Sequence, residues 1–291
     1  MRSLVALVVL LVGALLVPVA TVGWWVRDTV VPTRAYVATV GPLAQDDAVV
    51  AAVEQRLTEQ TMASITRAAS DTLPAALRER VTKLVRFAVD KLVEDPAFGT
   101  AWRTANVVAH DEVVAVLSGE TSSVRAGADS TVYVRLGSLG TEIRRELTAA
   151  GVPFTRSLPA FEADLPIGHT DDLVRARAGY DLLERYGRGL PVAALALIAL
   201  GLLVSRRRLQ ALGWTAFVAL GALGLLAVGM LVGRIYYVAS LPSGISDAAG
   251  TAVFDTMTAD LREDIITVAI GALVLLVLSA VLGRKTGRGA A

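Results

Sequence analysis

The sequence predicts a helical membrane protein with four transmembrane helices and an α-rich α+β extracytoplasmic domain between spans one and two. Three observations predict this fold class. Hydrophobic residues make up 54% of the 291 residues, and the mean hydropathy is +0.57; soluble domains contain roughly 45–50% apolar residues. Four long apolar runs contain no ionisable residue. All 27 acidic residues lie in only two segments, 24–188 and 235–264.

The four apolar runs predict the four membrane spans. A helix needs roughly 20 residues to cross a hydrocarbon core about 30 Å thick. The runs cover residues 3–23, 189–205, 212–233 and 265–282. The second run is the shortest, so we expect its helix to draw an additional turn from its outer flank.

The basic residues predict the orientation of these spans. The segments on the side opposite the acidic residues carry Arg2, Arg206–Arg208, Arg284, Lys285 and Arg288, and no acid. Lys/Arg-rich short loops stay in the cytoplasm, so we expect a plasma-membrane protein with both termini cytoplasmic. Arg206, Arg207 and Arg208 are therefore topology determinants. They are also expected to contact anionic lipid, at about 1 kcal/mol for each residue.

The predicted organisation alternates inner and outer segments. In chain order we expect transmembrane helix 1 (1–23), the extracytoplasmic domain (24–188), transmembrane helix 2 (189–205), a cytoplasmic hairpin (206–211), transmembrane helix 3 (212–233), an extracytoplasmic loop with an amphipathic helix (234–264), transmembrane helix 4 (265–283) and a cytoplasmic tail (284–291). We expect the first run to remain as an anchor, because one arginine is a weak n-region. A cleaved signal peptide is the alternative.

The outer domain is predicted to begin with three helices. Apolar residues recur with helical spacing over 46–69 and resume after Pro74. Asp95 and Pro96 have the residue types of an N-cap and a first-turn position, so a third helix should start there. It should run to about residue 118, with Gly119 as the residue that ends it.

The β part of this prediction rests on two alternating segments. Residues 131–136 and 161–165 alternate apolar and other side chains, which is typical of strands. A helix over 139–150 lies between them, and this spacing permits a right-handed parallel crossover. Two strands alone are marginally stable, so we expect them to pack on the helices.

Two amphipathic helices are predicted to lead directly into spans. One opens at Thr170 and reaches the second span through a kink at residues 187–191, which contain two glycines and a proline. The other opens at Ser246 and should continue through Ile265 into the fourth span. Such continuity would couple the outer segments stiffly to the membrane.

Four side chains on the third outer helix form the first candidate site: Phe98, Trp102, Asn106 and His110. They recur at every fourth position, so neighbouring members can touch. We interpret them as a core ridge in which Asn106 and His110 satisfy each other's hydrogen bonds. The alternative is a partly polar pocket that binds a ligand.

Gly229 and Gly233 form a G-x-x-x-G pattern in the third span. Small residues at this spacing let two helix backbones approach closely. We expect the pair to pack against another helix of this protein. The alternative is self-association into a homo-oligomer.

Several chemistries find no support in the sequence. There is no cysteine, and no histidine spacing typical of a metal site. Phosphate-binding loops and nucleophile motifs are absent, and the spans contain no ionisable residue of the kind that marks an ion path. Outer bases are interleaved with acids, which gives no nucleic-acid footprint. We therefore expect no catalytic residue, cofactor or metal site.

Three sequence features resemble a known family. These are Tyr36-Val-Ala-Thr-Val-Gly-Pro-Leu-Ala44, the Trp102…Asn106…His110 helix, and Phe254-Asp255…Leu261-Arg262. Together with the four-span layout, they resemble an uncharacterised family of integral membrane proteins from high-GC Gram-positive bacteria. The resemblance covers most of the chain and implies no activity or catalytic residues.

Function is predicted from sidedness and from the missing catalytic motifs. We expect a non-enzymatic scaffold or sensor that lies in the lipid bilayer and whose extracytoplasmic domain binds or positions an envelope protein, lipid or glycan. The first alternative is an accessory or pore-forming subunit of a transport assembly. The second is an outer-face hydrolase that uses His110 and nearby carboxylates.

Overall fold

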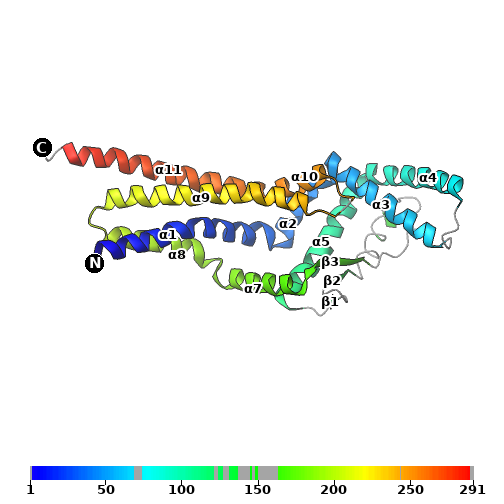
Figure 1. Cartoon of the computed structure of the whole chain (residues 1–291), viewed down its shortest axis with the longest axis horizontal. Helices are drawn as coiled ribbons and strands as arrows, with labels where there is room; N and C mark the ends of the chain where they lie inside the picture. The colour runs from blue at the N-terminus through cyan, green and yellow to red at the C-terminus, as the bar shows by residue number, and fades with distance from the viewer. Residues whose placement is uncertain are drawn as a thin grey trace. The chain divides into compact units, whose positions relative to one another are not determined.

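The computed structural model describes residues 2–68, 74–120, 124–126, 131–136, 145, 148–149, 163–242 and 244–288. The chain forms two compact units, shown in Figure 1. Unit 1 comprises Met1–Pro32, Ala178–Ile235 and Thr258–Ala291, and unit 2 comprises Thr33–Arg177 and Tyr236–Met257. Each unit is therefore assembled from segments that are distant in the sequence.

The described elements are mostly helices. In chain order they are α1 (Arg2–Trp25), the π-helix η1 (Val26–Val30), α2 (Thr33–Val40), the 3-10 helix η2 (Gly41–Gln45), α3 (Asp47–Ala68), α4 (Ala75–Glu94), α5 (Pro96–Ser118), β1 (Val124–Ala126), β2 (Thr131–Leu136), β3 (Ala163–His169), α7 (Thr170–Tyr186), α8 (Gly189–Val204), α9 (Arg208–Ala239), α10 (Asp247–Met257) and α11 (Ala259–Arg288).

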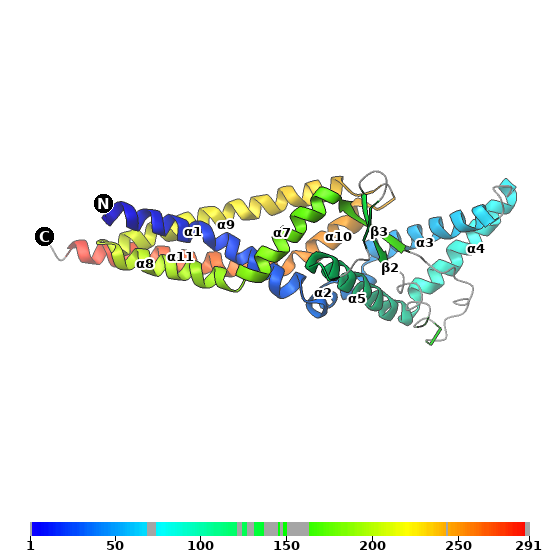
Figure 2. The same cartoon turned by 90° about the horizontal axis from the view of Figure 1, so that it is seen from below.

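Unit 1 is built from long apolar helices that run side by side (Figure 2). Its most extensive contact joins α1 to α8. Glycines permit this close approach, because a Cβ at Gly13 would lie 2.9 Å from Ile198 Cγ1, and one at Gly201 would lie 2.6 Å from Leu10 Cγ. Helix α1 also contacts α11. The missing side chains thus let the backbones of α1 and α8 pack directly together.

Three described helices are long and apolar enough to cross a membrane: Leu4–Val30, Arg208–Ala239 and Ala259–Gly283. A fourth candidate is the pair Leu173–Tyr186 and Gly189–Val204, which counts as one span only if its 61° bend is included. The bend lies at the predicted kink. Helix α8 alone has only 16 residues, so the second predicted span depends on the helix that precedes it, Leu173–Tyr186.

Unit 2 packs around a small apolar core. Val40, Leu43, Val49 and Ala249 are buried there, and Trp102 packs against them. These residues come from α2, η2, α3, α5 and α10. The core therefore joins the 33–177 segment to the 236–257 segment.

The starts and ends of the unit 2 helices agree with the capping residues in the sequence. The Asp46 carboxylate accepts hydrogen bonds from the backbone N–H groups of Ala48 (3.0 Å) and Val49 (3.1 Å) at the start of α3. Asp95 accepts one from the Ala97 N–H (2.8 Å) at the start of α5. Helix α5 ends before Gly119, whose φ of 78° suits glycine. The boundaries predicted for the third outer helix are confirmed.

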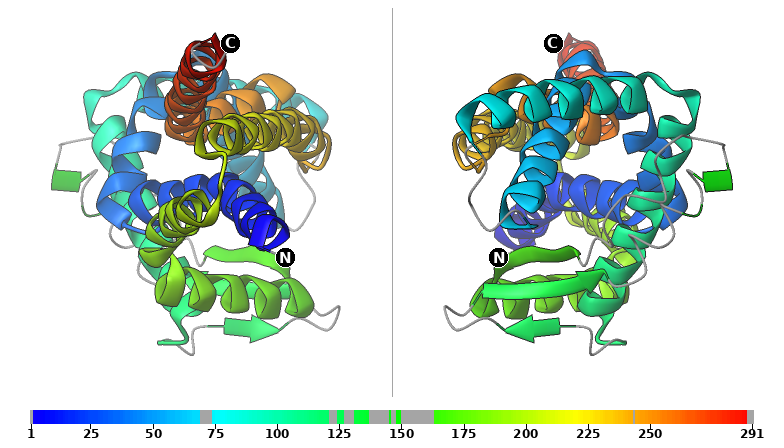
Figure 3. Two further views of the ribbon diagram at one scale, coloured as in Figure 1. Left: turned by 90° about the vertical axis from the view of Figure 1, so that its left-hand side faces the viewer. Right: turned by 90° about the vertical axis from the view of Figure 1, so that its right-hand side faces the viewer.

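The predicted α+β class of the outer domain is wrong. The structure is overwhelmingly helical, and an α+β domain is not supported. In the described residues its β-structure consists of three short strands in the order β1-β2-β3, drawn as arrows in Figure 3. Strand β2 pairs with β3 in antiparallel fashion, from Thr131 opposite His169 to Leu136 opposite Ala163, so the parallel crossover is also wrong. Alternation over five or six residues indicates extended backbone but carries no information about strand direction.

The helix that leads into the fourth predicted span is not continuous with it. The Ser246 hydroxyl accepts a hydrogen bond from the Ala249 N–H (3.1 Å), as its predicted capping role requires. Helix α10 then ends at Met257, and α11 begins at Ala259. The expected continuous helix is therefore interrupted at Thr258. The predicted helix over 139–150 and the first two residues of the 161–165 strand lie largely outside the described residues.

Candidate functional site

The ridge on α5 faces helix α2 within unit 2. Trp102 donates a hydrogen bond from its indole Nε1 to the Val40 carbonyl (3.0 Å), and its ring packs against the buried core. Phe98 lies one turn earlier, with its ring centroid 6.3 Å from that of Trp102. The first half of the ridge thus joins α5 to the end of α2.

The polar half of the ridge bonds to the start of α2. Asn106 donates to the Trp102 carbonyl (2.9 Å), and its side-chain oxygen lies 3.4 Å from the Tyr36 hydroxyl. The Thr33 hydroxyl lies 3.0 Å from His110 Nδ1 and donates to Asp111 (2.6 Å). A hydroxyl has one proton to donate. The Thr33 proton goes to the carboxylate, so His110 Nδ1 must carry the hydrogen and donate it to Thr33.

Tyr36 is the central side chain of the contact between α2 and α5, which we call the α2–α5 seam. Its ring stacks on the His110 imidazole, with centroids 4.1 Å apart. Burial raises the pKa of the Tyr36 hydroxyl above its ordinary value, and the nearby Tyr237 adds to the effect. A neutral hydroxyl is therefore favoured where it faces Asn106. The sequence pattern indicated the α5 residues but could not identify their partners on α2.

Helix α4 presents apolar side chains to solvent. The exposed fractions are 48% for Leu77, 68% for Leu84 and 61% for Phe87. Leu77 and Leu84 are two turns apart, so they share a helix face. Five bases and three acids lie along the same helix. We call Leu77, Leu84 and Phe87 the α4 stripe, and its surroundings are basic on balance.

Contacts between α3 and α4 include an acidic cluster. Burial raises the pKa of Glu54 above its ordinary value, and the negative charges of Asp90 and Glu94 raise it further. A groove of about 580 Å³ lies elsewhere between these two helices and is lined by Met62, Arg67, Arg86 and other side chains. The two helices of this hairpin therefore combine an acidic contact with a basic groove.

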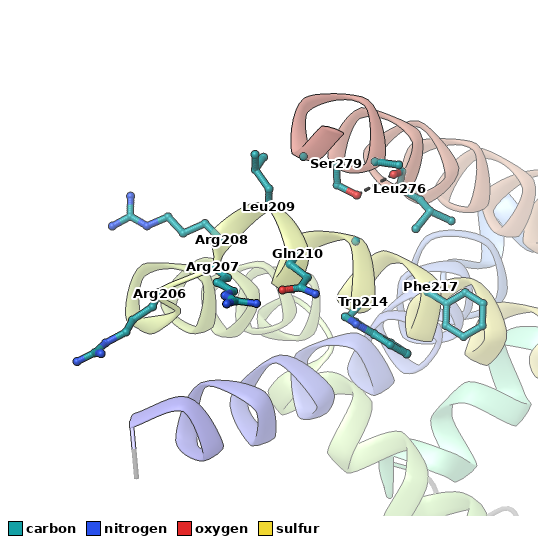
Figure 4. Close-up of a pocket in the computed structure, with 12 residues that line it drawn as sticks. Arg206, Arg207, Arg208, Leu209, Gln210, Trp214, Phe217, Leu276 and Ser279 are labelled. Atoms are coloured by element: carbon teal, nitrogen blue, oxygen red, sulfur yellow. Dashed lines mark hydrogen bonds between the residues drawn. The ribbon is translucent and has the colours of Figure 1, made fainter. Parts of the chain in front are cut away.

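In unit 1, the arginines of the α8–α9 connection lie at the ends of two grooves. Figure 4 shows Arg206 and Arg208 extending away from the helices, whereas Gln210 and Trp214 project from the first turns of α9. One groove, of about 1200 Å³, lies between α9 and α11. The other, of about 1050 Å³, is lined by α1, the end of α8 and α9.

Gly229 and Gly233 lie on an open part of α9. A Cβ at either position would meet no heavy atom within 4 Å. The described part of the chain therefore supplies no helix that packs against this motif. Helices approach each other closely at Gly13, Gly201 and Gly213 instead. None of these three glycines belongs to a G-x-x-x-G pattern.

In the segments that the structure describes, no three His, Cys, Asp or Glu side chains are grouped in a way that could hold a metal ion. Comparisons with protein-family models, with curated proteins and with solved structures found no match.

Proposed function

We propose that the chain is a non-enzymatic, multi-pass plasma-membrane protein whose extracytoplasmic part binds a partner in the cell envelope. The α4 stripe is the observation that carries this proposal. Soluble surfaces rarely gather large apolar side chains on one helix face without a binding role. Helix faces with anchors at this spacing are a common means of recognising a groove on another protein.

The chemistry of α4 defines the partner that fits it. Leu77, Leu84 and Phe87 require an apolar groove. The basic excess along the helix favours acidic residues at the rim of that groove, where charge complementarity speeds encounter and fixes orientation. A protein of the envelope meets both requirements, whereas a glycan supplies no apolar groove.

Sidedness is the first part of the proposal to test. The chain contains no cysteine, so single substitutions Glu120→Cys and Arg207→Cys introduce unique thiols. We expect a membrane-impermeant maleimide to label the first variant in intact cells and the second only after permeabilisation. The reverse result would place the α4 stripe in the cytoplasm and contradict the proposal.

The partner is tested with a photocrosslinking amino acid at Phe87 in living cells. The same amino acid at Glu79, an exposed polar position on α4, is the matched control. We expect a discrete adduct from position 87, a weak or absent one from 79, and loss of the adduct when Leu84→Asp is added. Identical adducts at both positions would indicate non-specific proximity and refute the role of the stripe.

A second function is supported by the open face at Gly229 and Gly233. Such a face suits close packing against a helix of another chain, as an accessory or pore-forming subunit of a transport assembly requires. Disulfide crosslinking of Gly229→Cys in membranes tests it. A purely monomeric product would remove this alternative.

A further inference from the structure

Two grooves flank the first turns of α9 and share several lining residues. The 1200 Å³ groove faces α11, and the 1050 Å³ groove faces α1. Arg206, Arg207, Gln210 and Trp214 line both of them. We call these two spaces together the α9 double groove. A ligand in either groove can therefore contact Arg206, Arg207 and Gln210.

The end of the double groove is strongly cationic. Arg206, Arg207 and Arg208 are all exposed, and residues 189–246 contain no acid. In the described ranges, none of the three arginines forms an ion pair. Planar guanidinium groups bind phosphate oxygens through paired hydrogen bonds. This end thus suits a phosphate group.

The walls of the double groove are apolar. Trp214 and Phe217 are 65% and 59% exposed, and their rings meet edge to face with centroids 6.0 Å apart. On the other side, Leu7 of α1 is 63% exposed. A free phosphate would use only the arginines, whereas a lipid would also cover these walls with its acyl chains.

Helices α9 and α11 approach each other closely within the groove that they line. A Cβ at Gly213 would lie 2.6 Å from Ser279 Oγ, so the two helices touch there. The Ser279 hydroxyl donates to the Leu276 carbonyl (2.7 Å), and its polar group is thereby satisfied. The groove wall at Ser279 therefore presents no unpaired hydroxyl to an acyl chain.

We propose that the α9 double groove binds an anionic phospholipid, with its phosphate on the Arg206–Arg208 guanidinium groups and its acyl chains along Trp214. Basic pockets between membrane helices are a known means of selecting anionic headgroups. The proposal goes beyond recognition of an envelope partner. It rests only on the insertion of the apolar helices into a membrane.

The test uses the full-length protein in phosphatidylcholine vesicles that contain brominated phosphatidylglycerol or, at the same mole fraction, brominated phosphatidylcholine. Bromine on the acyl chains quenches tryptophan fluorescence at contact. We expect stronger quenching by the anionic lipid, and loss of most of the excess in Trp214→Phe. Both leaflets have the same composition, so the orientation of the protein does not affect the result.

Arginine variants identify the headgroup contacts. About 1 kcal/mol for each basic residue corresponds to roughly a fivefold change in lipid preference. We expect that fold loss in Arg207→Gln and a larger loss in the triple variant of residues 206–208. Arg234→Gln removes a base near the other end of α9 and should retain the preference. The single variant and Trp214→Phe carry the test if the triple variant does not fold.

Three outcomes would overturn the proposal. Equal quenching by the two lipids would show no selectivity, and an unchanged preference in Arg207→Gln would exclude the arginine contact. Displacement of the lipid by excess inorganic phosphate would indicate a simple anion site. None of these outcomes affects the photocrosslink at Phe87, so failure of this proposal and failure of partner binding are distinguishable.

Discussion

The Tyr36 ring lies on the His110 imidazole, with centroids 4.1 Å apart and ring planes inclined by 21°. This stack is the centre of a seam that also contains the Thr33–His110 and Tyr36–Asn106 hydrogen bonds. All of these contacts join α2 to α5. The polar side chains of α5 are therefore parts of a helix–helix contact within unit 2.

The first prediction concerns His110. His110→Ala removes the stack and the bond to Thr33, at about 0.5–1.5 kcal/mol for each interaction. We expect unit 2 to lose about 1–3 kcal/mol, and His110→Phe, which keeps an aromatic ring, to lose about 1 kcal/mol. Hydrogen exchange of α2 peptides measures this loss. The exposed substitution Thr100→Ala on the same helix should change exchange little, and an equal effect would contradict the assignment.

The second prediction compares two tryptophans. Trp102 packs on the core and donates to the Val40 carbonyl, whereas Trp214 is 65% exposed. Trp102 is only half-buried, so Trp102→Ala should cost about 2–4 kcal/mol, somewhat below the range for a fully buried tryptophan. Trp214→Ala should stay within about 0.5 kcal/mol. Thermal unfolding in detergent measures both, and a Trp102→Ala variant of unchanged stability would favour a ligand pocket over a core ridge.

The third prediction concerns pH. Glu54 has a pKa raised above 4.5 by burial and by Asp90 and Glu94. Its folded-state pKa is higher than its unfolded-state pKa, so the folded state loses stability as pH rises from about 4.5 through the raised value. Glu54→Gln should remove this loss and stabilise the α3–α4 contact by a few tenths of a kcal/mol at pH 7. Melting temperatures of the two proteins across this pH range test the sign, and equal pH dependence of the two proteins would contradict the raised pKa of Glu54.

The fourth prediction concerns tyrosine ionisation. Burial raises the pKa of Tyr36 above 10.0. Of the six tyrosines, Tyr36 should therefore contribute a late step to a titration followed by tyrosinate absorbance. Tyr36→Phe should remove that step. Loss of an early step in Tyr36→Phe would contradict the burial of this hydroxyl.

The fifth prediction compares two glycines in unit 1. At Gly13 a Cβ would lie 3.2 Å from the Ile198 backbone nitrogen, but at Gly229 it would meet nothing. Gly13→Leu must separate α1 from α8 and should destabilise the protein by about 1–3 kcal/mol. Gly229→Leu should leave the monomer unchanged in detergent unfolding assays. If Gly229→Leu alone were destabilising, the self-association alternative would gain support.

Local signals in the sequence predicted the helices well. Asp95, Pro96 and Gly119 determine both ends of α5 because capping acts within one turn. Hydropathy likewise located α1, α9 and α11, because membrane spans require long apolar runs. The break at Thr258 was not predicted, since no proline or glycine marks it.

Contacts between distant residues could not be predicted in the same way. The spacing of Trp102, Asn106 and His110 indicated a common surface on α5, but Thr33 and Tyr36 lie about 70 residues earlier and carry no periodic signal. The apolar residues of α4 recur with helical spacing, yet Leu77 and Leu84 on this face are exposed. Periodicity shows that a face exists, and only the packing of other elements decides whether it is covered.

The split core of unit 2 has a consequence for biogenesis. Ala249 completes a core whose other members emerge from the ribosome much earlier, and residues 178–235 intervene. At roughly 5–20 residues per second, this intervening stretch takes about 3–12 s to synthesise. The core of unit 2 must therefore remain incomplete, without Ala249, until the late segment has been translated.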